Sequence, residues 1–235
     1  MKRLRWLFMA ACLSILSISY SCDNNDGYSI GDFAVDWATV RVTGNAFYLN
    51  GDTWGTSWPV NTDLGWYEPV DGQRVLAFFN PIYDNFQGYD HAVKILYLRN
   101  ALTKKVETLT PENEEEYGND PIRIFKGDIT VGGGYMNIIF QQDLPAKTKH
   151  RISLVQNETA EAVADGYLHL ELRYNDYDDM TGIYASGLVS FNLEGKDSDS
   201  EIKGIKLKIN SIVNGEVEVT LDKHSSETLK SVANE

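Results

Sequence analysis

The feature that most constrains the fold of this sequence is a series of short runs in which apolar and polar residues alternate. In the run LHLELRY (168–174), Leu168, Leu170 and Leu172 fall on one face of an extended chain, and His169 falls on the other. A period of two residues is typical of a β-strand with one buried face. Alternation or enrichment in β-branched residues recurs at 93–98, 135–141, 205–209 and 217–221. These runs predict an all-β fold.

Residues that favour turns separate the runs. In SIVNGEVEV, an Asn-Gly pair lies between two alternating segments, and this arrangement is the strongest short-range signal for a β-hairpin. Further glycine-containing turns are expected at 49–53, 70–73 and 131–135. The turns therefore support the prediction of many short strands.

The first part of the chain has the pattern of an export signal. Lys2, Arg3 and Arg5 precede an apolar run at 6–18, and small residues then lead to Cys22. This order is that of a secretory signal peptide. A membrane-spanning helix is the alternative, but it needs about 20 apolar residues, which is more than this run provides. An ordinary secreted protein is a further alternative.

The cysteine at the end of this segment predicts a bacterial lipoprotein. Residues 1–21 would be the cleaved lipoprotein signal peptide, and the thiol of Cys22 would carry the lipid as the new N-terminus. Two or three acyl chains give effectively permanent attachment to a membrane, because each buried methylene contributes about 0.8 kcal/mol. The following residues, 22–34, have no apolar period and are predicted to be a flexible tether.

Removal of the signal peptide changes the charge and leaves no free thiol. The formal net charge of −13 becomes −16, because three basic residues and no acidic ones are lost. Such an acidic chain is a poor partner for nucleic acid, whose binding requires clustered Lys and Arg. With Cys22 lipidated, no thiol remains for a disulfide, a nucleophile or a metal ligand. The hydrophobic core alone must stabilise the fold.

The length of the mature chain favours two domains over one. The segment TLTPENEEEYGNDP (108–121) is acidic, contains two prolines and lacks an apolar period. All tryptophans of the mature chain lie before it. We therefore interpret 108–121 as the junction between the domains.

Several phrases of the sequence carry a resemblance to a known family. The chain resembles the NigD-like lipoproteins of Bacteroidales in WPVN (58–61), PVDGQRV (69–75), TKKVETLTPEN…GNDPIRI (103–124), GGGYMNIIFQ (132–141), KHRISLV (149–155) and LELRYNDYDD (170–179). The resemblance implies an N-terminal OB-type barrel followed by a C-terminal β-sandwich. With the segments above, this gives an OB-like barrel at 35–107, a β-sandwich at 122–224 and a C-terminal tail at 225–235. It also implies an outer-membrane lipoprotein, and the family name refers to bacteriocin immunity.

The sequence offers no catalytic or metal-binding motif. The four histidines, at 91, 150, 169 and 224, have no ligand spacing. The acidic segment NDYDDMTG (175–182) could present Asp176, Asp178 and Asp179 to a cation such as calcium, but the spacing of an EF-hand is not met. A hairpin loop is the favoured interpretation of this segment. We expect no enzyme, no cofactor and no metal.

Aromatic residues in loops of the N-terminal half give the best indication of a binding site. Trp54 and Trp58 flank a Gly-Thr-Ser segment, and Trp66 and Tyr67 precede a turn. OB barrels bind oligomers across one strand face and its adjacent loops. These four residues are therefore predicted to contact a protein, peptide or glycan ligand. Many of the neighbouring aromatic residues would instead fill the barrel.

Two function classes remain open at this point. The first is a non-enzymatic envelope lipoprotein, a binding module of bacteriocin-immunity type. The alternative is a glycan-binding or glycan-active surface protein. An enzyme would need convergent polar groups with perturbed pKa values in a concave pocket, whereas a binding module needs only an exposed aromatic or hydrogen-bonding face.

The lipoprotein interpretation predicts that Cys22 carries acyl chains. Cells that express the protein in the presence of labelled palmitate should label the wild type, and Cys22→Ala should lose the label because no other thiol follows the signal peptide. The label is measured on the immunoprecipitated protein. Equal labelling of both proteins would contradict the assignment.

Overall fold

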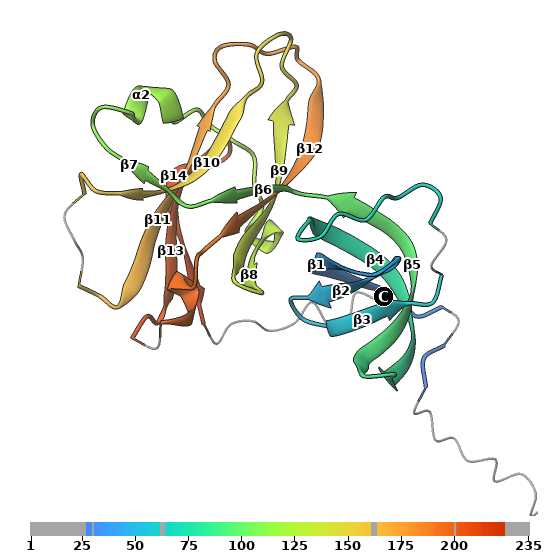
Figure 1. The fold of residues 1–235 in the computed structure, drawn as a ribbon. Coiled ribbons are helices and arrows are strands. Elements are labelled where there is room, and N and C mark those ends of the chain that lie inside the picture. The colour runs from blue at the N-terminus through green and yellow to red at the C-terminus, as the bar shows by residue number, and fades with distance from the viewer. Residues whose placement is uncertain (1–26, 30, 62–63, 161–163, 200, 224–235) are drawn as a thin grey trace, which may run out of the picture.

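The computed structural model describes residues 27–223, apart from 30, 62–63, 161–163 and 200. The predicted signal peptide, the lipidation site Cys22, residues 22–26 and 30 of the predicted tether and the tail at 225–235 lie outside the described residues. Within the part of the chain that is described, no helix is long and apolar enough to cross a bilayer. The architecture is all-β, with a barrel beside a sandwich (Figure 1).

The N-terminal domain is a closed five-stranded barrel with the order β1-β2-β3-β5-β4. Along β4, Val75, Ala77 and Phe79 point into the barrel core, because alternate side chains of a strand lie on opposite faces. The intervening residues of β4 lie on the outer face. The five strands are β1 (Ala34–Thr43), β2 (Ala46–Gly51), β3 (Gly55–Pro59), β4 (Arg74–Phe86) and β5 (Tyr89–Asn100).

The C-terminal domain is a sandwich of a five-stranded sheet, β14-β13-β11-β10-β7, and a four-stranded sheet, β6-β12-β9-β8. The predicted Asn-Gly hairpin is confirmed, since it joins β13 to β14. The strands are β6 (Leu102–Lys105), β7 (Glu107–Leu109), β8 (Ile129–Gly132), β9 (Tyr135–Asp143), β10 (Arg151–Asn157), β11 (Tyr167–Asn175), β12 (Tyr184–Asn192), β13 (Gly204–Ser211) and β14 (Gly215–Asp222). The short helical elements are α2 (Glu114–Tyr117), η1 (Lys126–Asp128) and η2 (Lys196–Ser198).

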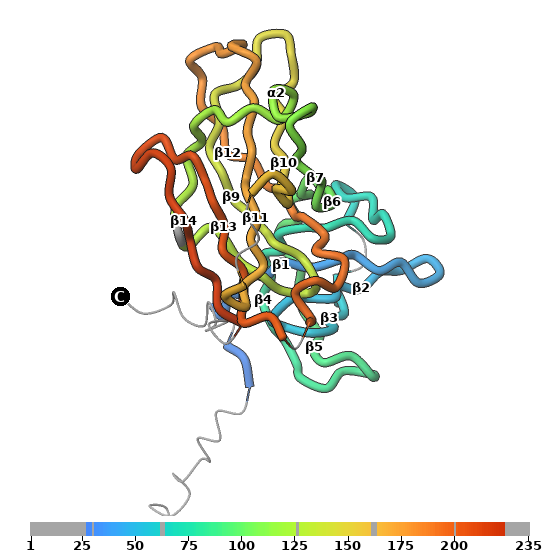
Figure 2. The backbone as a smooth tube through the Cα atoms, turned by 90° about the vertical axis from the view of Figure 1, so that its left-hand side faces the viewer, coloured from blue at the N-terminus to red at the C-terminus, as the bar shows by residue number. Residues whose placement is uncertain are grey.

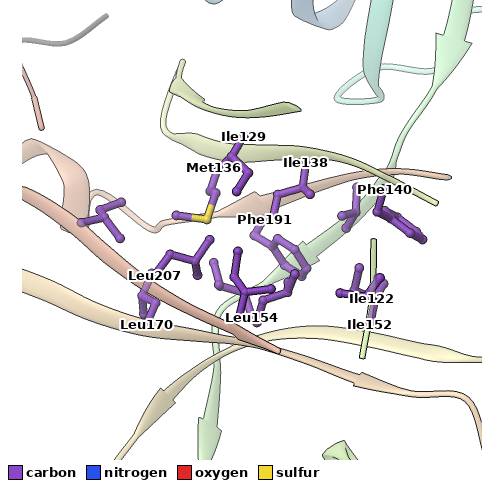
Figure 3. Close-up of a cluster of buried hydrophobic side chains, with 14 of the residues drawn as sticks. Ile122, Ile129, Met136, Ile138, Phe140, Ile152, Leu154, Leu170, Phe191 and Leu207 are labelled. Carbon is purple, nitrogen blue, oxygen red and sulfur yellow. The ribbon is translucent and has the colours of Figure 1, made fainter. Parts of the chain in front are cut away.

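The sandwich core forms where the inward side chains of the two sheets meet (Figure 3). Met136, Ile138 and Phe191 come from the four-stranded sheet, and Leu154 and Leu207 come from the five-stranded sheet. All five are fully buried. Burial of side chains of this size contributes about 1.5–3 kcal/mol each, which supports a fold without disulfides.

The change from barrel to sandwich occurs before the segment that the sequence suggested. Strand β6 pairs in parallel with β12, and β7 pairs in parallel with β10, so the chain joins the sandwich at Leu102. The acidic segment 108–121 belongs to the sandwich as well, since Leu109 and Tyr117 pack against Val155. The boundary differs from the expected one because β6 and β7 are short strands that pair with partners far along the chain. Their sequence therefore shows no clear local period.

A buried polar network joins the two domains. The Arg74 guanidinium, from β4 of the barrel, donates to both carboxylate oxygens of Asp52 at 2.8 and 2.7 Å. It also donates to Oδ1 of Asn137, on β9 of the sandwich, at 2.9 Å. Asn137 donates from Nδ2 to Asp52 at 2.9 Å and accepts a hydrogen bond from Ser190 at 2.7 Å. Because Arg74 is completely buried, its charge depends on these partners.

The turn between β8 and β9 must approach Asp52 closely. A Cβ atom on Gly133 would lie 2.3 Å from Oδ1 of Asp52, and one on Gly132 would lie 2.8 Å from its Cβ. Gly133 also has a positive φ of 57°, which favours glycine. The glycine-rich turn thus lets the sandwich backbone reach the network.

An apolar cluster lies beside this network and completes the domain interface. Trp37, Leu76 and Ala101 of the barrel side are buried together with Leu188 of β12. Ile139 of β9 packs against the same cluster. At its edge, Arg99 donates to the backbone carbonyl of Ser186. The outer face of the barrel is therefore packed directly on the outer face of the four-stranded sheet.

Removal of the buried charge tests how far the two domains depend on this interface. Arg74→Ala should lower the free energy of unfolding by about 3–5 kcal/mol, because Asp52 would be left as an uncompensated buried carboxylate. Denaturation in guanidinium chloride measures the loss. Lys94→Ala, at an exposed position of β5, is the matched control and should change stability by less than about 0.5 kcal/mol. A loss for Arg74→Ala as small as that of the control would contradict the role of the network.

Candidate ligand-binding surface of the barrel

The structure does not bring the four predicted aromatic residues into one group. Trp54 is half-buried and packs against the barrel core, with its ring 5.3 Å from that of Phe79 and 4.9 Å from that of His91. Its ring also lies 6.2 Å from that of Tyr28, so Trp54 is a partly buried part of the barrel packing.

The position of Trp54 is fixed by a buried carboxylate on β1. Asp36 accepts hydrogen bonds from the Thr53 hydroxyl at 2.5 Å and from the Trp54 backbone N–H at 3.0 Å. Burial raises the pKa of Asp36, although these hydrogen bonds act in the opposite direction. A Cβ atom on Gly51 would lie 2.2 Å from the same carboxylate, so glycine is needed for this close approach. The turn between β2 and β3 is therefore rigidly held.

Trp58 lies on a different part of the barrel. It is half-buried on β3, and its ring lies 4.9 Å from that of Tyr89 at the start of β5. Tyr89 in turn lies 5.2 Å from Tyr48 on β2. These three rings come from β2, β3 and β5, which are neighbours in the barrel. The face of the second and third strands is the one that many OB folds use for ligands.

Trp66 and Tyr67 differ in burial although they are neighbours in the sequence. Tyr67 packs against the barrel core near Phe47, at a ring distance of 6.1 Å, and burial raises the pKa of its hydroxyl. Trp66 is more than half exposed. Its ring stacks on that of Tyr97, with 6.0 Å between the centroids and an interplanar angle of 24°.

Trp66 is one end of a row of four aromatic rings on the outer face of the barrel. From Trp66 the row continues to Tyr97, then to Phe78 at 6.1 Å and to Phe33 at 6.2 Å. We call these four residues the aromatic stripe. Phe33 and Tyr97, like Trp66, are more than half exposed. Phe78 packs against the apolar cluster of the domain interface, so the stripe lies directly beside that interface.

A β-bulge explains why two consecutive apolar residues of β5 reach the surface. Phe78 pairs with Tyr97 and Phe79 pairs with Ile95, so Leu96 is the extra residue of the bulge. Both Leu96 and Tyr97 are exposed as a result. The sequence analysis missed Phe33, Phe78 and Tyr97 as parts of a site. The alternation along β4 could have placed Phe78 outside, but no local signal marks the bulge.

Polar groups of the barrel converge near the described end of the tether rather than at the stripe. Asp84 accepts a hydrogen bond from the Tyr28 hydroxyl at 2.7 Å and contacts Nδ1 of His91 at 2.6 Å. The Tyr28 bond is the main reason why the pKa of Asp84 is lowered. Burial and the nearby carboxylate raise the pKa of Tyr28 to about 12. These contacts fasten residue 28 to the barrel.

The acidic segment 175–182 lies between β11 and β12, but it is not the hairpin loop that the sequence favoured, because β11 and β12 belong to different sheets and the loop crosses from one sheet to the other. Its Asp179 carboxylate accepts backbone N–H groups of Ala146, Lys147 and Thr148, which lowers its pKa. The carboxylate therefore holds a neighbouring loop. Among the described residues, no group of three or more His, Cys, Asp or Glu side chains is arranged to hold a metal ion.

The fold and this surface define a class of protein: a two-domain β protein in which an OB-type barrel is packed on a β-sandwich. Comparison with known families gives the same division. The NigD-like N-terminal OB domain matches residues 37–100, and the NigD-like C-terminal β-sandwich domain matches residues 105–223. The chain belongs to the NigD-like family, as the resemblance in the sequence implied.

Solved structures with the same fold come from species of Bacteroides and Parabacteroides. A protein of unknown function from Bacteroides vulgatus is 27% identical, with a TM-score of 0.74 over 83% of this chain and 92% of the other. A protein described as toxin related, from Parabacteroides distasonis, is 33% identical, with a TM-score of 0.68 over 83% and 95%. A NigD-like immunity protein from Bacteroides caccae is 18% identical, with a TM-score of 0.58 over 82% and 93%, and shows the fold alone. None of the curated proteins matches the chain.

The different surroundings of Trp54 and Trp66 lead to a direct test. Trp54→Ala should lower the free energy of unfolding by about 2–4 kcal/mol, because it leaves a cavity beside Phe79. Trp66→Ala should change it by less than about 0.5 kcal/mol, because its ring lies on the surface. Thermal or chemical denaturation of the two variants measures both values. Equal losses would mean that Trp66 is a core residue and not part of a binding surface.

Proposed function

We propose that this chain is a non-enzymatic lipoprotein of the cell envelope that binds a protein partner through the aromatic stripe. The observation that carries the proposal is the exposure of Trp66, Tyr97 and Phe33 in one row of rings, in which Phe78 lies between Tyr97 and Phe33. Cys22 would attach the chain to the outer membrane. The barrel and sandwich would then be held near the membrane by the tether.

The stripe has the physical properties of a contact surface. Each exposed ring forgoes burial worth about 1.5–3 kcal/mol, and several such rings together usually mark an interaction site. Phe78 and Tyr97 come from paired strands, so the rings are held in place before a partner arrives. Binding of a partner therefore costs little conformational entropy at this surface.

The chemistry of the chain favours a protein over a nucleic acid. The mature chain has a formal charge of −16, obtained from −13 by removal of three basic residues, and such a surface repels phosphates. Aromatic residues such as those of the stripe are enriched at protein–protein interfaces. The names of two relatives, an immunity protein and a toxin-related protein, support a partner that is itself a secreted toxin or bacteriocin. A role of bacteriocin-immunity type is the one that we propose on this basis.

A glycan ligand is the second candidate, and a different observation favours it. Tyr48, Trp58 and Tyr89 form a ring group on the strand face that OB folds use for oligosaccharides. The rings are half-buried, so part of their surface is accessible for a sugar to contact. A Trp58→Ala variant separates this candidate from the stripe, because Trp58 does not belong to the stripe.

Quantitative capture of partners from envelope and culture-medium fractions tests the stripe. The mature chain with Cys22→Ser is immobilised and serves as the wild type. It should retain at least one protein whose recovery falls by about tenfold or more on the double variant Trp66→Ala/Tyr97→Ala. Tyr83→Ala is the matched control, because Tyr83 is an exposed barrel residue outside the stripe. It should retain the same protein.

Folding must be checked in parallel. The double variant should melt within about 4 °C of the wild type, so that lost binding cannot be attributed to unfolding. Equal recovery on the wild type and the folded double variant would contradict the role of the stripe. Loss of a bound glycan, and not of a protein, on Trp58→Ala would favour the second candidate.

A further inference from the structure

A second exposed apolar surface lies at the far end of the sandwich from the barrel. The loop between β11 and β12 and the loop between β9 and β10 lie side by side there, at the top in both Figure 1 and Figure 2. Three large apolar side chains of the first loop and the first residue of β12 are exposed, and the exposed fraction is 62% for Ile183 and 63% for Tyr184. We call this surface the sandwich tip, and define it as Tyr177, Met180, Ile183 and Tyr184.

The tip is rigid although it is made of loops. Asp143 accepts the backbone N–H groups of Thr181 at 2.7 Å and Gly182 at 2.9 Å. The Leu144 N–H donates to the Ile183 carbonyl at 2.7 Å. These bonds act together with those from Asp179 to the neighbouring loop. Four exposed apolar side chains are thus presented on an ordered backbone, which lowers the entropic cost of binding.

The interior of the sandwich does not account for these side chains. The core of the domain is already filled by residues of the two sheets, and the four tip residues belong to none of its buried clusters. Tyrosine and methionine are enriched at protein interfaces. Several large apolar side chains exposed within one short segment are typical of a contact site.

The charges around the tip indicate what kind of partner fits. Asp176 and Asp178 lie within the loop between β11 and β12. Asp120 accepts the backbone N–H of Asp176 at 2.9 Å, and Asp143 accepts that of Thr181. The combined field of Asp176, Asp120 and Asp143 contributes, after burial, to a raised pKa of Tyr174. Asp179 is a fifth carboxylate, and the adjoining loop contributes two basic residues, Lys147 and Lys149. The tip is therefore apolar with a net negative rim.

We propose that the sandwich tip binds a cationic amphipathic polypeptide, whose apolar side chains cover Met180 and Ile183 and whose basic side chains face Asp176 and Asp178. An acidic rim disfavours an anionic lipid surface, and it disfavours a second copy of this acidic chain. The inference rests on the proposed function only in taking the chain to be a binding protein. It concerns a surface that shares no residue with the aromatic stripe.

Fluorescence anisotropy with synthetic peptides tests this assignment on the full mature chain with Cys22→Ser. The probes are an amphipathic peptide built only of leucine and lysine, and a matched peptide of leucine and glutamate. The lysine peptide should bind, and its affinity should fall as salt is raised, while the glutamate peptide should not bind. The variants Met180→Ser/Ile183→Ser and Asp176→Asn/Asp178→Asn should each weaken binding by about tenfold or more.

Two control variants locate the binding and keep the outcomes distinct. Tyr83→Ala, an exposed aromatic residue on the barrel, and Trp66→Ala/Tyr97→Ala, in the stripe, should both bind the lysine peptide within about twofold of the wild type. Equal binding by the tip variants, or equal binding of the glutamate peptide, overturns the proposal. Loss confined to the stripe variant also overturns it but leaves the proposed function intact. Conversely, failure of the stripe in the capture experiment leaves this result unaffected.

Discussion

The buried guanidinium of Arg74 is the interaction on which the arrangement of the two domains depends. Its charge is removed from water, so it requires partners, and these come from both domains: Asp52 of the barrel and Asn137 of the sandwich. Satisfying one buried ion therefore fixes the barrel on the four-stranded sheet. Gly132 and Gly133 are needed for the same network, because any side chain at either position would collide with Asp52. A barrel with a small core and no disulfide is in this way stabilised by its neighbour.

The same alternation along β4 and β5 produces both the domain interface and the aromatic stripe. Arg74 and Leu76 point outward and are covered by the sandwich, whereas the next outward position, Phe78, lies at the edge of that contact. Tyr97, paired with Phe78, is already exposed. The stripe is thus the continuation of the interface beyond the point where the sandwich stops covering it. Its position relative to the sandwich is as fixed as the interface itself.

Much of the fold could be predicted from the sequence, because alternation and turns are local signals. The all-β class, the hairpin at 213–216 and the family follow from runs and phrases only a few residues long. The entry of the chain into the sandwich at Leu102 could not be predicted, since β6 and β7 owe their structure to distant partners. Of the proposed stripe, the exposure of Trp66 could be expected from its loop position. That of Tyr97 could not, because a bulge moved it to the surface, and Tyr67 proved to pack on the core.

The parallel pairing of β6 and β7 has a consequence for the order in which the protein assembles. A chain that emerges N-terminus first can close the barrel once Asn100 is available, because all five strands precede that residue. The next two strands then have no partner until β10 and β12 have been made, and contacts between residues so far apart in sequence form slowly. During that interval, the outer face around Leu76 has no sandwich to cover it. A barrel that closed before the sandwich was complete would therefore carry an uncovered apolar face, which the sandwich buries in the folded protein.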